Sequence, residues 1–276
     1  MPFQIDDLHG AYLKYNEFSK NNNFSFHERF IFPYICGTYF GYRKVDVLRV
    51  VAIAKSISPK PRYLDVGCGY GDFLEKVREF IPEAIGIEKD VGIFYEFNMA
   101  KPDYIHIKDV SLDLNEKYDV IFVGWMDPGV DFRKAVAGCT DCIITNFDAG
   151  GQCGINGGCE YEEFGFRRIA WWRTPSWIDV NYQIMNKYYT KMSDETKRGL
   201  FKLRSAHTMW YVYAKENLSS IVNNALKLWI KKESEHSSDD QKYDFEVILD
   251  ECGFHYNEEL VTLTHANKAL WKVFFE

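Results

Sequence analysis

Apolar residues recur at two different spacings along the chain, and the change between them divides it into parts. Val45, Leu48, Val51 and Ala52 lie three or four positions apart, which predicts a helix that ends at the prolines within 56–61. From residue 62 onward, short apolar runs alternate with helical stretches, the pattern of a parallel sheet with helical crossovers. The pattern predicts an N-terminal helical cap over residues 1–60, followed by an α/β domain.

Five short apolar runs are predicted as parallel strands, at residues 63–66, 84–87, 104–107, 118–123 and 142–145. Most of them start roughly 20 to 25 residues apart, which fits repeated strand–helix units. A helix is predicted over 73–80, a short helical piece over 160–166, and two later strands over 168–172 and 208–214. We therefore expect a Rossmann-like sheet within residues 61–216.

The last part of the chain, residues 217–276, is predicted as an α+β extension. Helices are expected over 218–231 and 245–252, and an antiparallel pair is expected between 260–263 and 270–275. Two hairpins, one ending at 214 and one at 275, are candidates to complete the main sheet. The extension is expected to support a homodimer, to complete a substrate cavity or to add to the main sheet.

Composition narrows the classes of partner. Hydrophobic residues make up 46% and charged residues 26%, as in a soluble globular protein, and the net charge of −7 disfavours a nucleic-acid surface. No run approaches the ~18 apolar residues of a membrane helix, and the acidic, polar N-terminus is unlike a signal peptide. Seven scattered cysteines do not form a disulfide framework, so a reducing cytoplasm is the expected compartment.

Four of the cysteines, Cys139, Cys142, Cys153 and Cys159, lie within 21 residues, which leaves two interpretations. Four thiolates can hold zinc tetrahedrally, or the thiols can simply be buried in the core and a loop. The second interpretation is favoured, because Cys142 begins a buried strand and the interval from Cys153 to Cys159 is wide for a zinc knuckle. We expect no metal.

The clearest chemical signal is the segment Leu64-Asp-Val-Gly-Cys-Gly-Tyr-Gly-Asp72, where the first predicted strand meets a helix. Glycines at such a turn let backbone N–H groups approach a ligand closely. Gly67, Gly69 and Gly71 form G-x-G-x-G, whereas the dinucleotide fingerprint requires glycine at position 72. Asp65, two residues before the first glycine, would repel a pyrophosphate and attract an ammonium or sulfonium group.

A second signal is Glu88, which ends the second predicted strand. It lies 23 residues after Asp65, where a carboxylate can accept hydrogen bonds from both hydroxyls of a ribose. The combination of the glycine turn, Glu88 and the strand–helix rhythm indicates a nucleoside-containing ligand.

Residues 62–145 resemble the class I S-adenosylmethionine-dependent methyltransferases. The resemblance rests on the segment 65–71, Glu88, Asp109-Val110 and the segment 118–128. It implies S-adenosylmethionine as the cofactor, with the glycine turn at its methionine part, Glu88 at the ribose and Asp109 near the adenine amino group. The residues it implies for cofactor binding are Asp65, Gly67, Cys68, Gly69, Gly71, Glu88, Lys89, Asp109, Val110 and Gly124.

The segment after the fourth predicted strand implies where the methyl group is transferred. Asp127-Pro128 is similar to the Asp/Asn-Pro-Pro-aromatic motif of amino-methylating families, but Gly129-Val130 replace the last pair, so amino-group methylation is not established. Asp127 either orients the acceptor or belongs to a simple turn. Trp125 is a candidate to stack beside the sulfonium by a cation–π contact or to cover the adenine.

Other aromatic and basic residues carry further hypotheses. Arg43, in the segment 38–44, is a candidate to meet the cofactor's carboxylate, with core packing as the alternative. Trp171, Trp172 and Trp177 are candidates to line an acceptor cavity or to form a core for additional helices.

The favoured function is methylation of a small-molecule acceptor at nitrogen or oxygen. A protein or RNA acceptor is the first alternative, although the acidic charge disfavours RNA. An NAD-type oxidoreductase and a non-catalytic, cofactor-binding scaffold subunit are the alternatives from other classes. The sequence does not identify the acceptor or the methylated atom.

Overall fold

The computed structural model describes residues 37–96, 98–127, 129–148, 153–155, 159–176, 179–180, 183, 208–236, 242–257, 259–260 and 268–276. The chain separates into two compact units. Unit 1 comprises Met1–Lys44, Thr174–Thr208 and Asp240–Lys272, and unit 2 comprises Val45–Arg173, Met209–Asp239 and Val273–Glu276. Parts of the predicted cap and extension occur in both units, and the predicted domain boundaries stay a prediction.

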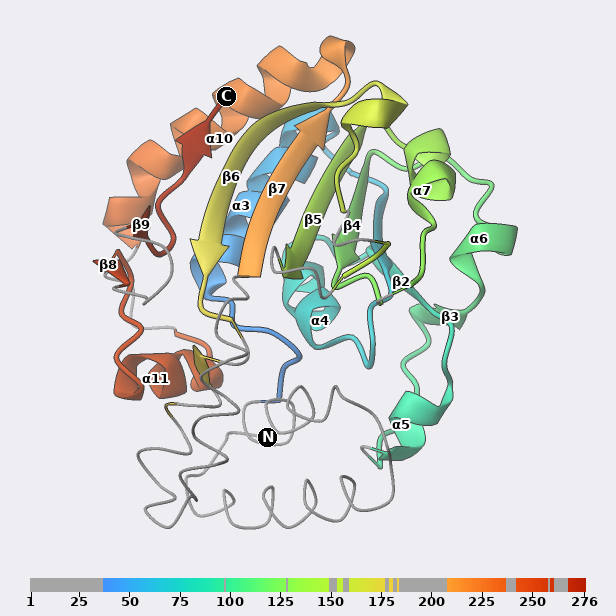
Figure 1. The fold of residues 1–276 in the computed structure, drawn as a ribbon, viewed down its shortest axis with the longest axis horizontal. Helices are drawn as coiled ribbons and strands as arrows, with labels where there is room; N and C mark the ends of the chain where they lie inside the picture. Colours follow the sequence, from blue (N-terminus) through green and yellow to red (C-terminus); the bar gives the residue numbers. More distant parts are fainter. Residues whose placement is uncertain are drawn as a thin grey trace. The chain divides into compact units, whose positions relative to one another are not determined.

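An eight-stranded sheet, in the order β10-β6-β7-β5-β4-β1-β2-β3, runs through the described part of unit 2 (Figure 1). Its strands are β1 (Tyr63–Val66), β2 (Ile85–Glu88), β3 (Ile105–Ile107), β4 (Val120–Gly124), β5 (Cys142–Asp148), β6 (Arg167–Thr174), β7 (Thr208–Ala214) and β10 (Phe274–Phe275). β1 pairs in parallel with both β2 and β4, so the strand order reverses beside β1. In open α/β sheets, ligands bind at the carboxyl ends of the strands next to such a reversal.

The described helices follow the strands as crossovers or lie near the two ends of the chain. They are α3 (Lys44–Ile57), α4 (Asp72–Arg78), α5 (Gly92–Glu96), α6 (Val110–Asp113), α7 (Arg133–Cys139), α10 (Glu216–His236) and α11 (Asp244–Glu251), with a 3₁₀ turn at Glu162–Phe164. The Rossmann-like α/β sheet predicted from the apolar pattern, with a helix before it and an α+β segment after it, is confirmed.

Both candidate segments, the one ending at 214 and the one ending at 275, add strands to the main sheet. β7 lies between β5 and β6, and β10 adds to the outer edge of β6 by antiparallel pairing. The predicted pairing of 260–263 with 270–275 is wrong, because the described strand β8 (Glu259–Leu260) pairs with β9 (Lys268–Ala269) in a separate sheet. Phe274 instead stacks on Trp171 of β6, with ring centroids 4.3 Å apart.

The two faces of the sheet carry different cores. On one face, which we call the aliphatic face, Leu64, Val66, Ile121 and Val123 form a buried cluster that also includes rings such as Phe147. The other face, which we call the aromatic face, carries four rings in which each contacts the next: Phe73, Phe122, Trp210 and Trp172. Side chains alternate between the faces along each strand, so Asp65 lies on the aromatic face and Val66 on the aliphatic face.

A buried charged network holds α3 to the aromatic face. Arg49 donates two hydrogen bonds to the carboxylate of Glu233 in α10, at 2.6 and 2.8 Å. Its guanidinium also lies 5.1 Å from the ring of Trp172, and the indole N–H of Trp172 donates to Asp46 at 2.7 Å. Trp172 is fully buried in this network, which assigns it to the core and not to an acceptor cavity.

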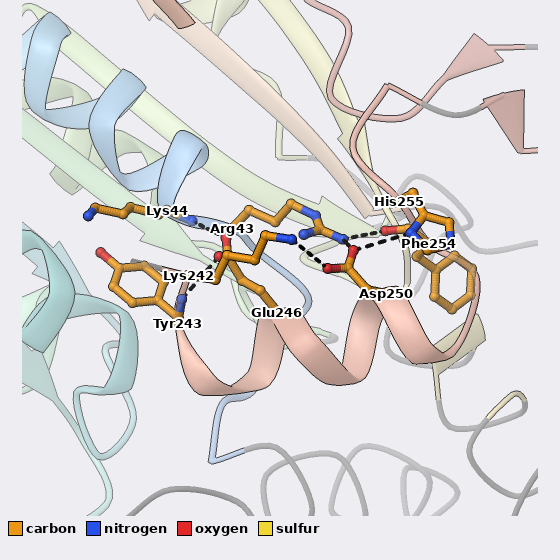
Figure 2. Close-up of polar contacts among 8 residues, drawn as sticks. All are labelled: Arg43, Lys44, Lys242, Tyr243, Glu246, Asp250, Phe254 and His255. Atoms are coloured by element: carbon orange, nitrogen blue, oxygen red, sulfur yellow. Dashed lines mark hydrogen bonds and ion pairs between the residues drawn. The ribbon is translucent and has the colours of Figure 1, made fainter. Parts of the chain in front are cut away.

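Unit 1 contains a second network, centred on Arg43 (Figure 2). The guanidinium of Arg43 donates to Asp250 at 2.6 Å and to the carbonyl of Phe254 at 2.5 Å, and it lies over the ring of Trp271. Burial raises the pKa of Asp250, but the hydrogen bond and charge of Arg43 outweigh it and hold that pKa below its ordinary value. The hypothesis that Arg43 meets the cofactor's carboxylate is therefore wrong: this side chain anchors α11.

Candidate functional site

The glycine turn after β1 is held in a conformation that other residues rarely adopt. The N–H groups of Gly67 and Cys68 both donate to the carbonyl of Ile87, at 2.9 and 3.2 Å, so the turn is bonded to the end of β2. Gly67, Gly69 and Gly71 have φ angles of 68°, 58° and 88°, in the left-handed region that favours glycine. A Cβ atom at Gly67 would lie 3.9 Å from the carbonyl oxygen of Gly124, its nearest atom outside the neighbouring residues, which leaves space beside the turn.

Gly71 is required for a further reason. A Cβ atom at this position would lie 2.6 Å from Cδ1 of Ile105, and α4 begins at the next residue. The glycine therefore lets α4 start directly behind the turn, close to β3. Cys68, between the glycines, is buried, and burial together with the nearby carboxylates raises the pKa of its thiol. The thiol stays protonated at neutral pH and is not a nucleophile.

Glu88 ties the two predicted parts of the site together. Its Oε2 accepts the N–H of Gly69 at 2.8 Å, and its Oε1 accepts the N–H groups of Lys89 and Asp90 at 2.7 and 3.0 Å. Burial raises the pKa of Glu88, the backbone hydrogen bonds lower it, and the negative charge of Asp127 raises it further. The carboxylate thus lies beside the glycine turn, within electrostatic reach of Asp127.

Asp65 is the most unusual group in the site. It is 2% exposed, and no described residue donates a hydrogen bond to its carboxylate. Burial raises the pKa of Asp65 well above its ordinary value, and the charges of Asp72 and Glu88 raise it further. A buried carboxylate of this kind is costly without a positive or hydrogen-bonding partner.

The sheet register places the site residues in one row across the carboxyl ends of four strands. Gly124 of β4 pairs with Asn146 of β5, and Gly67 lies one residue beyond the aligned residues Val66 and Val123. The order across the sheet is therefore Glu88, Gly67, Gly124 and Asn146. The two central positions carry no side chain, and neighbouring strands are ~4.8 Å apart, so a polar residue stands on each side of a bare stretch of backbone.

The segment after β4 changes direction at Trp125 and is bonded to the end of β5. Trp125 has a φ of 59°, uncommon for a bulky residue, and its N–H donates to the carbonyl of Asn146 at 2.7 Å. Such conformations are concentrated at functional sites. Asp127 is exposed two residues later, and the carbonyl of Met126 accepts the N–H of Gly154 from the loop after β5.

Lys89 and Asp109, predicted near the nucleoside, are bound to each other. Nζ of Lys89 lies 2.7 Å from Oδ2 of Asp109, whose Oδ1 accepts the N–H of Ser111 and caps α6. Lys89 is 76% exposed, so this ion pair contributes little to stability and is easily exchanged for a ligand. Val110, the next residue, is buried.

Two polar residues of this edge are absent from the sequence-based prediction. Asp72 adds a third carboxylate beside Asp65 and Glu88, and its signal in the sequence was an acidic residue in the first turn after the glycines. Asn146 follows an apolar run as Glu88 does, so the same strand-end rule identifies it. The predicted residues Asp65, Gly67, Glu88 and Gly124 are brought together at this edge.

The described residues contain no group of three or more His, Cys, Asp or Glu side chains arranged to hold a metal ion. None of their helices is long and apolar enough to cross a membrane. Trp177, a candidate for the acceptor cavity, lies outside the described residues.

The strand order decides the fold. The parallel strands run β3-β2-β1-β4-β5, and β7 is inserted between β5 and β6 with its arrow opposed to theirs (Figure 1). The glycine turn follows β1 and the acidic residue ends β2 in this arrangement. The chain has the class I methyltransferase fold. The resemblance inferred from residues 62–145 is confirmed at this level.

No family model and no curated protein matches the chain. One similar solved structure is a putative sarcosine dimethylglycine methyltransferase from Galdieria sulphuraria, at 14% identity over 62% of this chain and 84% of that chain (TM-score 0.46). Others are coclaurine N-methyltransferase bound to N-methylheliamine and SAH, at 9% identity over 62% and 70% (TM-score 0.41), and an SAM-bound amino pentose methyltransferase from Micromonospora echinaspora, at 22% identity over 38% and 51% (TM-score 0.32). At these identities and TM-scores, none of these similarities assigns a cofactor or a substrate to this methyltransferase-fold chain.

Proposed function

We propose that this protein is an S-adenosylmethionine-dependent methyltransferase that acts on a small-molecule acceptor at nitrogen or oxygen. The observation that carries the proposal is the buried carboxylate of Asp65, with its raised pKa, beside the glycine turn. Asp65, Asp72 and Glu88 together create a negative potential that opposes a pyrophosphate and favours a ligand with cationic groups. S-adenosylmethionine carries an ammonium and a sulfonium group, whereas NAD carries a pyrophosphate.

The residues of the site fit this cofactor. Asp65 would hold the ammonium group, the glycine turn would admit the methionine part, and the carboxylate of Glu88 would accept hydrogen bonds from the ribose hydroxyls. Lys89, Asp109 and Val110 follow β2 and β3 and are assigned to the nucleoside, while Cys68 and Gly124 line the turn and the end of β4. These assignments agree with the open space beside Gly67.

Little acid–base chemistry is required of the protein. Bound S-adenosylmethionine supplies an electrophilic methyl group attached to a positively charged sulfur. The protein's task is to align the acceptor, which supplies much of the rate, and to exclude water. Asp127 is the candidate group to orient the acceptor or take a proton from it, since its carboxylate is exposed at the end of β4. Trp125, in its left-handed conformation beside Gly124, is the candidate to stack against a cationic group.

A small acceptor is favoured over RNA because the net charge is −7 and the site itself is acidic. This choice also supports an acceptor with a basic or neutral polar group, since an anionic acceptor would be repelled by the site carboxylates.

The test is transfer of a trideuteromethyl group from labelled S-adenosylmethionine to fractions of small molecules, protein and RNA, followed by mass spectrometry. We expect labelled products in the small-molecule fraction, made by the wild type and by the control Asp103→Asn, an exposed carboxylate of the same unit. Asp65→Asn should make far less product. Labelling confined to RNA or protein would replace the proposed acceptor class, and binding of NAD in place of S-adenosylmethionine would reject the function.

A further inference from the structure

Asn146, at the carboxyl end of β5, has a fully buried carboxamide. Its exposed fraction is 0%, and neither Nδ2 nor Oδ1 has a hydrogen-bond partner among the residues that the structure describes. Most buried polar side-chain atoms are bonded, so one group with two unbonded polar atoms calls for a physical explanation. A ligand that binds at the site would supply the missing partners.

The position of Asn146 in the row indicates which ligand. Glu88 on β2 and Asp65 on β1 are the groups that suit a ribose and an ammonium, and Asn146 lies on β5, beyond Gly124. Two strand spacings of ~4.8 Å separate β1 from β5, so Asn146 lies ~10 Å across the sheet from Asp65, on the side away from Glu88. Alternation along β5 places its side chain on the aromatic face, the face that also carries Asp65.

The backbone connects Asn146 to the residues nearest the proposed chemistry. Its carbonyl accepts the N–H of Trp125, the residue with the left-handed conformation after β4. Displacement of Asn146 would therefore also displace Trp125. The carboxamide is neutral and offers both donors and an acceptor, so it suits a neutral group that can itself both donate and accept, such as an amine, a hydroxyl or an amide.

We propose that the carboxamide of Asn146 binds the methyl acceptor, and that the acceptor carries a neutral donor–acceptor group at this point. This inference rests on the proposed function and adds a residue that determines acceptor specificity. It assigns no role to Asn146 in holding the cofactor.

The test variant is Asn146→Leu, because leucine has the same branched shape without polar atoms. The control is Thr145→Val. Thr145 is also fully buried, with a hydroxyl that no described residue bonds, but it lies on the opposite face of the sheet. Both variants should raise the Tm of the ligand-free protein by about 2–6 °C, because each removes unbonded polar atoms from the interior. A lower Tm for Asn146→Leu would show that the amide is bonded in solution and would overturn the proposal.

The binding readout uses protein labelled with ¹⁵N at asparagine and saturated with S-adenosylhomocysteine. The side-chain amide signal of Asn146 is assigned by its loss in Asn146→Leu or, should that variant not fold, in Asn146→Asp. Aniline, ethanol and propionamide serve as neutral amine, alcohol and amide probes, since an alkylamine would be protonated at neutral pH and could not accept a hydrogen bond. We expect at least one of them to shift this signal in the wild type and in Thr145→Val, and to bind at least about 10-fold more weakly to Asn146→Leu.

Other outcomes separate this inference from the proposed function. If S-adenosylhomocysteine binds and no probe shifts the signal, the inference about Asn146 is rejected while the proposed function stands. A shift caused by S-adenosylhomocysteine alone, with a weaker affinity in Asn146→Leu, would assign the amide to the cofactor and also reject the inference. Failure of the wild type to bind S-adenosylhomocysteine would reject the proposed function itself.

Discussion

Asp65→Asn should make the ligand-free protein more stable and should reduce the further stabilisation that a bound ligand provides. The substitution keeps the shape of the side chain and removes a buried negative charge that has carboxylates as neighbours. The carboxamide is still polar, so the gain comes from removal of the charge and of its repulsion by Asp72 and Glu88. Because a buried group without partners costs about 1–3 kcal/mol, and more when it is charged, we expect a gain of about 1–3 kcal/mol of folding free energy. For a chain of this size each kcal/mol changes the Tm by about 2–4 °C, so the Tm should rise by several degrees.

The same substitution should weaken ligand binding. Loss of a charge-assisted bond to an ammonium costs about 1.5–3 kcal/mol, a factor of at least 10 in the dissociation constant. A ligand at 100 times its dissociation constant stabilises the fold by about 2.7 kcal/mol, and a 10-fold weaker ligand at the same concentration contributes only about 1.4 kcal/mol. The increase in Tm caused by S-adenosylhomocysteine should therefore fall to about half or less in Asp65→Asn.

The pH dependence of the Tm tests independently whether the charge of Asp65 destabilises the folded protein. Because the pKa of Asp65 is raised in the folded protein, the wild type binds more protons folded than unfolded between the two pKa values, and its stability falls as pH rises through that window. The unfolded value is about 3.9, so the Tm advantage of Asp65→Asn should be small near pH 4 and grow above it. Scanning calorimetry of the wild type, Asp65→Asn and Asp103→Asn from pH 4 to 8 measures this. A lower Tm for Asp65→Asn at neutral pH, with an unchanged ligand response, would refute the reasoning.

Three further predictions concern other parts of the structure. Gly71→Ala combines a left-handed backbone with a 2.6 Å contact, so urea unfolding should show a loss of about 2–4 kcal/mol. The control Gly138→Ala, with open space within α7, should cost no stability and should gain at most about 1 kcal/mol from helix propensity. Arg49→Leu removes the guanidinium that pairs with the buried carboxylates of Glu233 and Asp46 and should cost about 3–5 kcal/mol in the same assay. The double variant Arg49→Leu/Glu233→Leu should recover part of this loss, because Asp46 stays buried without the guanidinium. Glu88→Ala should weaken S-adenosylhomocysteine by at least about 10-fold in calorimetric titration, since it removes the carboxylate proposed for the ribose, and an unchanged affinity would exclude that role.

Local signals in the sequence predicted much of the sheet. The strands at 63–66 and 208–214 coincide with β1 and β7, because apolar runs and strand propensity act within a few residues. The pairing of the last strand was not predictable in this way. Phe274 pairs with β6 across more than 100 residues of sequence through ring stacking on Trp171, a contact that no local pattern encodes.

The candidate site also contains residues that the sequence predicts and residues that it does not. Asp65, the glycines and Glu88 were predictable, because their roles follow from their places at strand ends and turns. Arg43 and Trp172 were not, since a cation or a ring suits a ligand and a core equally well, and only the distant partners Asp250 and Asp46 decide between them. Asn146 became a candidate only through its burial without a partner, which is a property of the folded chain.

The central claim is that the row of residues from Glu88 to Asn146 forms a site for a cationic, nucleoside-containing cofactor. Calorimetric titration of the wild-type protein with S-adenosylhomocysteine, with NAD in a parallel titration, tests it most directly. The account predicts micromolar binding of S-adenosylhomocysteine, lost in Gly69→Arg, and no binding of NAD. Binding of NAD with no binding of S-adenosylhomocysteine would contradict it.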